Sequence, residues 1–423
     1  MPSVTVSDGL LSIVQVAAGV LAVRLLPFAL YSALRIDELR RSQAAVLLGL
    51  FAIAVAAIYL VNPTGMMLLL WSTAALAYFA CIGAVFHYVR LSRPVDSRRQ
   101  VAVFLLAIAC YVAVPALAMP RWLAPLVLVG GWEQIFSSYS YAVDSPEVES
   151  SLGDGLFFLL VNPVLVFTMR SPAGPAEERP APVRAFGRVL SGVTVICAQC
   201  AILSILSDLS RRGFVLKNLA EVDGANAYVR FIAYYVGQCF ALYAIHTGVA
   251  SIEIGCMAVL GYRIPERYSH PFAATTPMEF WSRWNTYLGD WLRRHVFFPV
   301  VMFLRRRRSS ATPAAVVGVL AVFTTIGILH AVVPVASRSR AGGATFFALV
   351  LVFLVHGTAL LVWEAIRRRS ERLLPSPETR PQLRRVTAFG SWLMLRHLNA
   401  VLAWVALPAI ARGVLPPELG RMW

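Results

Sequence analysis

Residues 313–336 read PAAVVGVLAVFTTIGILHAVVPVA, and this stretch decides the fold. A helix needs about 20 predominantly apolar residues to cross the hydrocarbon core of a bilayer, and the stretch is long enough. Its only ionisable residue is His330. A titratable ring at that depth must face other protein or a water-filled cavity, because lipid does not solvate it. His330 is therefore a candidate functional residue.

Similar apolar runs recur along the whole chain, which has 423 residues, 58% of them hydrophobic and 14% charged. Soluble domains are about 45–50% apolar and about 25% charged. We predict one all-α, polytopic transmembrane bundle over residues 1–423, with about eleven membrane helices and half-helices around a central tunnel. Besides the opening stretch, the apolar runs are Leu10–Leu34, Ala44–Val61, Met66–Phe86, Val101–Met119, Trp122–Phe136, Gly155–Met169, Gly187–Ser207, Ala227–Leu260, Val296–Leu304, Ala344–Trp363 and Thr387–Ala411.

Some of these runs do not have the length of a simple crossing. Trp122–Phe136, Gly155–Met169 and Val296–Leu304 are short and are expected to be re-entrant or tilted half-helices. The run Ala227–Leu260 is long enough for one helix and part of a second.

The formal net charge is +16, and the arginines gather at the ends of apolar runs. In a membrane protein this pattern marks cytoplasmic loops, so it does not indicate nucleic-acid binding. The clusters at 305–308 and 367–372 are expected to be cytoplasmic, and the N-terminus outside. Such clusters also suit anionic lipid headgroups or an anionic substrate.

The six cysteines all lie in apolar runs, which predicts no disulfides. The spacing of Cys197 and Cys200 is weak evidence for metal, because no other Cys or His lies nearby in the sequence. No His, Cys, Asp or Glu group has a recognised metal-ligand spacing. We therefore expect neither a metal site nor a bound cofactor.

The segment Trp281–His295 is aromatic and basic. If it is one helix, its aromatic residues share one face with Asn285, and its arginines fall mostly on the other. An interfacial helix with tryptophans at headgroup depth is an equally good interpretation. It does not account for Asn285, since a buried amide must find partners. Asn285 either bridges helices or directs its NH2 group at a substrate carbonyl.

His330 has no acidic neighbour in its own run, so burial is expected to favour the neutral imidazole. A neutral imidazole is the form that a general base needs. His356 also lies within an apolar run, and the sequence alone does not rank one of the two above the other.

Two segments resemble a known family. Residues 261–285 read GYRIPERYSHPFAATTPMEFWSRWN, and residues 327–330 read GILH. They are similar to the two signatures of the membrane-bound O-acyltransferase family, and weaker similarity extends over about residues 130–336. His330 matches the family's catalytic histidine, and Asn285 its second polar position. Leu329, Ala331 and His295 depart from what bacterial members often have, which affects the expected acceptor more than the reaction.

The resemblance implies transfer of an acyl group from a thioester, acyl-CoA or acyl carrier protein, to a hydroxyl of a lipid, glycan or small molecule. We expect a bacterial-type enzyme of the cytoplasmic membrane, with His330 and Asn285 catalytic. The candidate substrate-binding residues are Trp281, Arg283, Trp284, Trp291, Arg293, Arg294 and His295. The alternative is a transporter or flippase of a lipid-linked or polar intermediate, for which polar residues within crossings would form the path.

Overall fold

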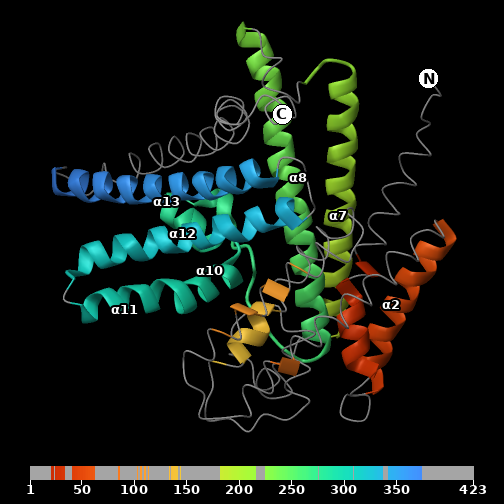
Figure 1. The fold of residues 1–423 in the computed structure, drawn as a ribbon. Coiled ribbons are helices and arrows are strands. Elements are labelled where there is room, and N and C mark those ends of the chain that lie inside the picture. Colours follow the sequence, from red (N-terminus) through yellow and green to blue (C-terminus); the bar gives the residue numbers. More distant parts are fainter. Residues whose placement is uncertain are drawn as a thin grey trace. The chain divides into compact units, whose positions relative to one another are not determined.

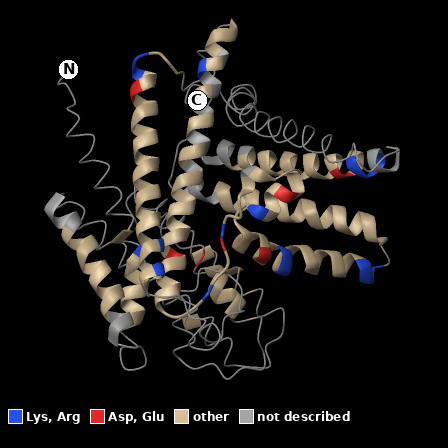
Figure 2. Cartoon of the chain, turned by 180° about the vertical axis from the view of Figure 1, so that it is seen from behind, with Lys and Arg blue, Asp and Glu red and all other residues tan. Residues whose placement is uncertain are grey.

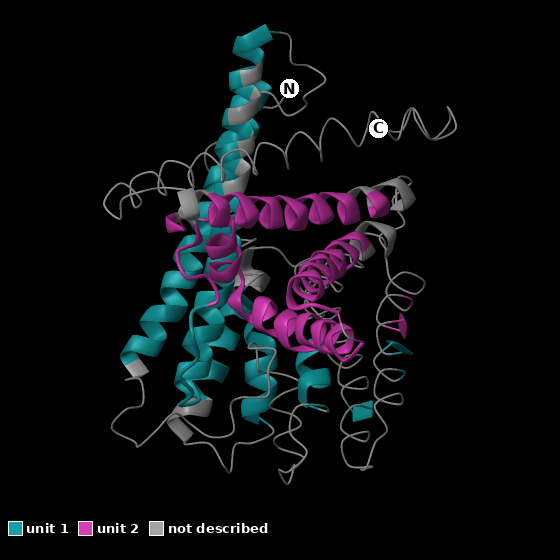
Figure 3. Ribbon diagram, turned by 90° about the vertical axis from the view of Figure 1, so that its left-hand side faces the viewer, with its two compact units in different colours: residues 1–107, 131–266 teal, residues 108–130, 267–423 magenta. Residues whose placement is uncertain are grey.

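The computed structural model describes residues 182–215, 224–274, 276–307, 309–336 and 342–373 continuously, with 24–33, 41–61, 135–141 and a few isolated residues nearer the N-terminus. The regular structure in these residues is helical (Figure 1). The all-α prediction is confirmed for them. The chain divides into two compact units, residues 1–107 with 131–266 and residues 108–130 with 267–423 (Figure 3). The predicted single domain stays a prediction.

The first unit contains α2 (Arg41–Val61), α7 (Pro182–Arg211) and α8 (Gly224–Val259). Helices α7 and α8 pack as an antiparallel pair (Figure 1). Glycines allow the two backbones to approach closely. A Cβ atom added at Gly248 would lie 2.9 Å from Gly192 O, and one added at Gly255 would lie 2.9 Å from Ala185 O. Small residues of this kind are what membrane helices use to associate.

The same unit holds an internal ion pair that the sequence did not predict. Arg24 Nη1 lies 3.0 Å from Glu253 Oε1 and 3.7 Å from Glu133 Oε2. Glu253 is buried within the apolar helix α8. A carboxylate in such surroundings requires a partner, so the arginine stabilises its charged form.

The second unit begins with short helical elements and ends with long ones. Their order is η3 (Pro271–Ala273), α9 (Pro277–Arg283), α10 (Thr286–Leu292), a π-helical turn η4 (Arg293–Phe297), α11 (Phe298–Arg306), α12 (Ala311–Ala336) and α13 (Gly342–Leu373). Helix α12 packs against α11, η4 and α13.

Helices α12 and α13 run antiparallel, side by side (Figure 1). Their backbones approach closely at Gly327, where an added Cβ would lie 2.8 Å from Val350 Cα. Within α12, the hydroxyls of Thr324 and Thr325 donate to the carbonyls of Leu320 and Ala321, each at 2.8 Å. This bonding satisfies polar groups that lipid would leave without partners.

Three described helical stretches are long and apolar enough to cross a membrane: Val183–Arg211, Ala311–Ala331 and Leu349–Arg369. Each coincides with a predicted run. The run Ala227–Leu260, which is long enough for one helix and part of a second, forms the single helix α8 of 36 residues. The total of about eleven segments and the central tunnel stay predictions. Runs that lie wholly or mostly outside the described residues are Met66–Phe86, Val101–Met119, Trp122–Phe136, Gly155–Met169 and Thr387–Ala411.

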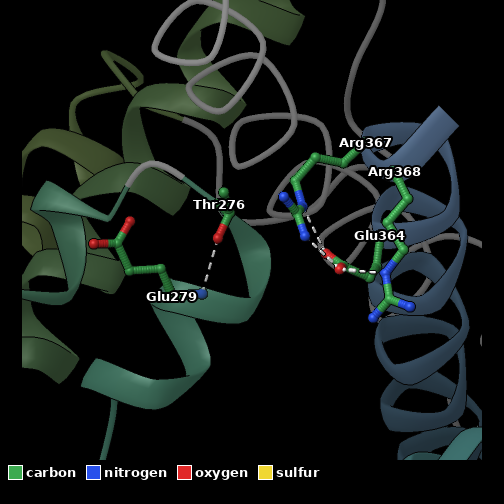
Figure 4. Close-up of polar contacts among 5 residues, drawn as sticks. All are labelled: Thr276, Glu279, Glu364, Arg367 and Arg368. Atoms are coloured by element: carbon green, nitrogen blue, oxygen red, sulfur yellow. Dashed lines mark hydrogen bonds and ion pairs between the residues drawn. The ribbon is translucent and has the colours of Figure 1, made fainter. Parts of the chain in front are cut away.

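The basic clusters at the ends of α11 and α13 lie on the same side of the second unit (Figure 2). Antiparallel packing of α12 and α13 explains this, because the chain enters and leaves the pair at one end. At the end of α13, Glu364 Oε1 lies 2.5 Å from Arg367 Nη2 and 2.8 Å from Arg368 Nε (Figure 4). One carboxylate therefore offsets part of the positive charge there.

Candidate active site

The segment carrying the first signature starts at a well-formed helix cap. Thr276 Oγ1 accepts a hydrogen bond from Glu279 N at 3.0 Å (Figure 4). Pro277 occupies the first helical position, where its missing N–H costs nothing. The sequence Thr-Pro-Met-Glu therefore fixes where α9 begins, and with it the direction of the Phe280 and Trp281 side chains.

The prediction of one helix from Trp281 to His295 is wrong. Helix α9 ends at Arg283, and Asn285 adopts the left-handed conformation with φ 43° and ψ 65°. Asparagine tolerates this conformation better than most residues. The chain therefore turns between Trp284 and Thr286, so Trp281 does not share a continuous helical face with Trp291 or His295.

The side chain of Asn285 also caps the next helix. Its Oδ1 accepts a hydrogen bond from Leu288 N at 3.3 Å, which makes Asn285 the N-cap of α10. The amide oxygen is engaged in this bond, and the NH2 group is the part of the side chain that can serve as a donor to a ligand. The role of that NH2 group at a substrate carbonyl stays a prediction.

The three tryptophans of the segment all pack against other rings in the second unit. The indole of Trp284 stacks on Phe280 and meets Tyr268 edge-on, with ring centroids 5.7 and 5.2 Å apart. Trp291 is buried and lies 4.9 Å from His295. Their substrate-binding roles stay predictions, and the packing shows that they also build the core around α9 and α10.

The arginines of the segment lie near its surface. Arg283 Nη2 pairs with Glu279 Oε1 at 2.5 Å, and Arg293 Nη2 with Asp290 Oδ1 at 2.5 Å. Arg293 and Arg294 are exposed on the π-helical turn η4. Single π-helical turns inside α-helices are frequent at functional sites. An anionic ligand at Arg293 would have to compete with the carboxylate of Asp290.

His330 lies on α12, one turn after Gly327. Its Nδ1 is 2.9 Å from the carbonyl oxygen of Ile326. A carbonyl oxygen can only accept, so Nδ1 carries the proton and donates it. In the neutral ring the lone pair is then on Nε2, the atom that can act as a base. The residue keeps exposed surface, and its ring packs against that of Phe353, with ring centroids 4.7 Å apart.

His356, which the sequence could not rank against His330, has different surroundings. It is buried on α13 and meets Trp281 edge-on, with ring centroids 5.7 Å apart and an interplanar angle of 90°. Phe353 lies between the two histidines, 6.3 Å from His356 and 4.7 Å from His330. The structure thus links Trp281 of the first signature to His330 of the second through two rings of α13.

Sequence reasoning missed this link because its members come from three helices. The only sequence signal was the spacing of Phe353 and His356, which places both on one face of a helix. Among the described residues, no group of three or more His, Cys, Asp or Glu could hold a metal ion.

Comparison with known proteins agrees with the two signatures. Residues 264–353 match the family described as "Membrane bound O-acyl transferase family". The matched segment includes Asn285 and His330 and ends at Phe353. The family resemblance is confirmed by this match, whereas the bacterial branch and the significance of Asn at the first signature are not tested by it.

Individual relatives carry acyltransferase names. The chain is 30% identical over 161 residues to the probable long-chain-alcohol O-fatty-acyltransferase 7 of Arabidopsis thaliana, covering 37% of this chain and 43% of that protein. It is 24% identical over 190 residues to the probable alginate O-acetylase of Azotobacter vinelandii, covering 44% and 33%. The chain thus spans less than half the length of each of these relatives.

Proposed function

We propose that this chain, whose residues 264–353 match the membrane-bound O-acyltransferase family, moves an acyl group from a thioester to a hydroxyl. One observation carries the proposal: on α12, within the segment that matches the family, the His330 ring donates from Nδ1 to the Ile326 carbonyl, which leaves Nε2 as the basic atom. The donor is acyl-CoA or acyl carrier protein, and the thioester is a co-substrate; no resident cofactor is required.

In the proposed reaction, Nε2 of His330 takes the proton of the acceptor hydroxyl. The oxygen forms a bond to the thioester carbonyl carbon, and the C–S bond then breaks. The leaving thiolate takes the proton back from the imidazolium, so the ring ends neutral. General-base help of this kind contributes roughly 10²–10⁴-fold to the rate. No acyl-enzyme is required, because the base acts directly on the acceptor.

Asn285 is proposed to donate its NH2 group to the oxygen that becomes negative in the tetrahedral intermediate. The cap bond to Leu288 N holds the amide in one orientation, which supports this role. A donor fixed in advance costs no reorganisation when the charge develops. Trp281, Trp284, Trp291 and His295 are proposed to line the acceptor or acyl path around it.

The exposed arginines Arg293 and Arg294, with Arg283 nearby in the sequence, are proposed to bind the phosphates of the donor carrier. Guanidinium groups suit phosphate because their donors form a planar fork. The relatives' names include an alcohol and a polysaccharide acceptor, so the proposed acceptor class is a hydroxyl of a lipid, glycan or small molecule. We place the protein in the bacterial cytoplasmic membrane with its N-terminus outside.

The test is acyl transfer in membranes with a labelled thioester donor, comparing the wild type with His330→Ala. We expect the variant to lose roughly 10²–10⁴-fold of its rate while keeping its fold, as judged by monodisperse behaviour in detergent. His246→Ala, at a half-buried histidine of α8 outside the matched segment, is the matched control and should retain activity. Full activity of a folded His330→Ala variant contradicts the mechanism. Movement of substrate across the membrane without thioester turnover would favour the transporter instead.

A further inference from the structure

His356 is the second histidine of the α12–α13 pair, and its contacts differ in kind from those of His330. It is buried, with 9% of its surface exposed, whereas His330 is exposed. The His356 ring packs against the rings of Trp281 and Phe353. Its burial between them suits a positioning task better than proton transfer to a bound hydroxyl.

The aromatic rings around His356 form a continuous series of contacts. Its edge-on contact with Trp281 is the arrangement that aromatic pairs prefer. On its other side is Phe353, whose ring lies 4.7 Å from that of His330 at an interplanar angle of 40°. Trp281 is also held edge-on by Phe323 of α12, at 5.3 Å. Each ring that matters to the proposed site is thus fixed by a neighbour from a different helix.

Close packing of α12 against α13 holds these rings in place. A Cβ added at Gly357, next to His356, would lie 2.9 Å from Cδ2 of Phe323, so α13 lies directly against that ring. Three residues before His330, the Gly327 backbone meets that of Val350. The interface between α12 and α13 therefore cannot shift near His330 or His356 without moving Trp281 or Phe353.

We propose that His356 is a positioning residue of the acyltransferase site: it holds Trp281 directly and His330 through Phe353, so that the first signature and the base keep one relative geometry. This inference rests on the proposed function. It gives α13, which lies wholly beyond the two signatures in sequence, a defined task in the site. A histidine held in this way acts through the shape of its ring and takes no proton from the substrate.

The test compares His356→Ala with His356→Phe, because phenylalanine keeps a ring of similar shape and cannot transfer a proton. In thioester turnover by the full chain in detergent or membranes, His356→Ala should lower kcat by about 10- to 100-fold, since small displacements of reacting groups cost this much. The KM for the donor should change little. His356→Phe should recover most of kcat and keep the pH profile of the wild type.

Two outcomes overturn the proposal. One is wild-type kcat in His356→Ala. The other is a His356→Phe variant as inactive as His330→Ala, which would make His356 a proton carrier. If His356→Ala does not accumulate, Phe353→Ala removes the next ring in the series of contacts and should show the same loss of kcat.

Hydrogen exchange of residues 277–292 separates this inference from the proposed function. If His356 holds Trp281, exchange in this segment should be faster in His356→Ala than in the wild type and restored in His356→Phe, whether or not the protein turns over a thioester. Unchanged exchange rejects the positioning role. A wild type without turnover, but with the expected exchange pattern, rejects the acyltransferase reaction and leaves the ring contacts supported.

Discussion

At the scale of single residues, Asn285 carries two tasks that are usually separate. Its backbone takes the left-handed conformation that ends α9, and its side-chain oxygen caps α10. Both tasks concern structure, and the proposed task in catalysis belongs to the NH2 group. Substitutions that keep one task and remove another can therefore separate them.

Asn285→Asp should keep the fold and lose activity. A carboxylate oxygen can still accept the bond from Leu288 N and aspartate tolerates the left-handed conformation, but the NH2 donor is gone. Loss of one oxyanion donor lowers kcat by about 10²–10³-fold. Steady-state turnover alongside thermal unfolding in detergent measures both effects. Wild-type turnover in Asn285→Asp would show that the amide donor is not used.

Asn285→Ala should be destabilising as well as inactive. It removes the cap, which costs about 1–2 kcal/mol, and places a β-carbon in the left-handed region, which adds about 1–2 kcal/mol. Thermal unfolding should show a lower midpoint than for Asn285→Asp. Equal midpoints for the two variants would contradict the cap observed at Leu288 N.

At the scale of elements, glycines set how closely the helices approach. The α7–α8 pair meets at Gly192 and Gly248, and the α12–α13 pair at Gly327. In each case an added side chain meets backbone atoms, which cannot move aside as the end of a flexible side chain can. Stability of these pairs therefore depends on the absence of side chains at a few positions.

Gly248→Leu should destabilise the first unit. Its β-carbon alone would lie 2.7 Å from Ile196 Cγ1 and 2.9 Å from Gly192 O. Overpacking of this kind typically costs about 1–3 kcal/mol. The matched control is Gly187→Leu on the same pair's α7, where nothing lies within 4 Å of an added Cβ. Thermal unfolding in detergent should separate the two variants, and equal midpoints would contradict the packing.

Gly327→Ala should reduce activity more than its single methyl group suggests. The added carbon would lie 2.8 Å from Val350 Cα, so α12 and α13 must separate near His330 and Phe353. We expect kcat to fall by about 10-fold or more, because His330, the proposed base, is displaced relative to Phe353. Gly49→Ala in α2, with open space around the added Cβ, serves as the control. Turnover of both variants under saturating donor is the measurement.

The sequence predicted the long helices well and the turns between them poorly. Apolar length alone located α7, α12 and α13, because only a helix satisfies its backbone in lipid. The break at Asn285 was missed, because the residues on both sides keep helical spacing. A single residue in the left-handed conformation does not change the periodicity of the apolar residues in the sequence. The surroundings of His356 were also missed, since they depend on which helices pack together. His330 and Asn285 were singled out as polar residues in apolar surroundings, and the resemblance to the family signatures then supplied the catalytic roles predicted for them.

At the scale of the whole molecule, the arginine clusters predict how the helices are oriented in the membrane. The basic clusters at the ends of α11 and α13 lie on the same side of the second unit, and most of the α12–α13 hairpin separates them in sequence. Arginine-rich ends of this kind are retained on the cytoplasmic side. The two clusters should therefore share one compartment, with the start of α13 in the other.

Cysteine labelling tests this arrangement. In a background without the six natural cysteines, Arg306→Cys and Arg369→Cys should both react with an impermeant thiol reagent added from the cytoplasmic side. Gly342→Cys, at the start of α13, should react from the opposite side. Inside-out and right-side-out vesicles provide the two exposures. Reaction of Arg306→Cys and Arg369→Cys from opposite sides would contradict the antiparallel hairpin as a membrane-spanning pair.

The contact between Gly327 and Val350 also limits where a long acyl chain of the proposed substrate could bind. Where the two backbones touch, a hydrocarbon chain cannot pass between them. The α12–α13 interface at Gly327 therefore cannot set the preferred length of an acyl chain. Substitutions that lengthen or shorten the preferred acyl chain should therefore map to other side chains near His330, and none should map to Gly327 or Val350.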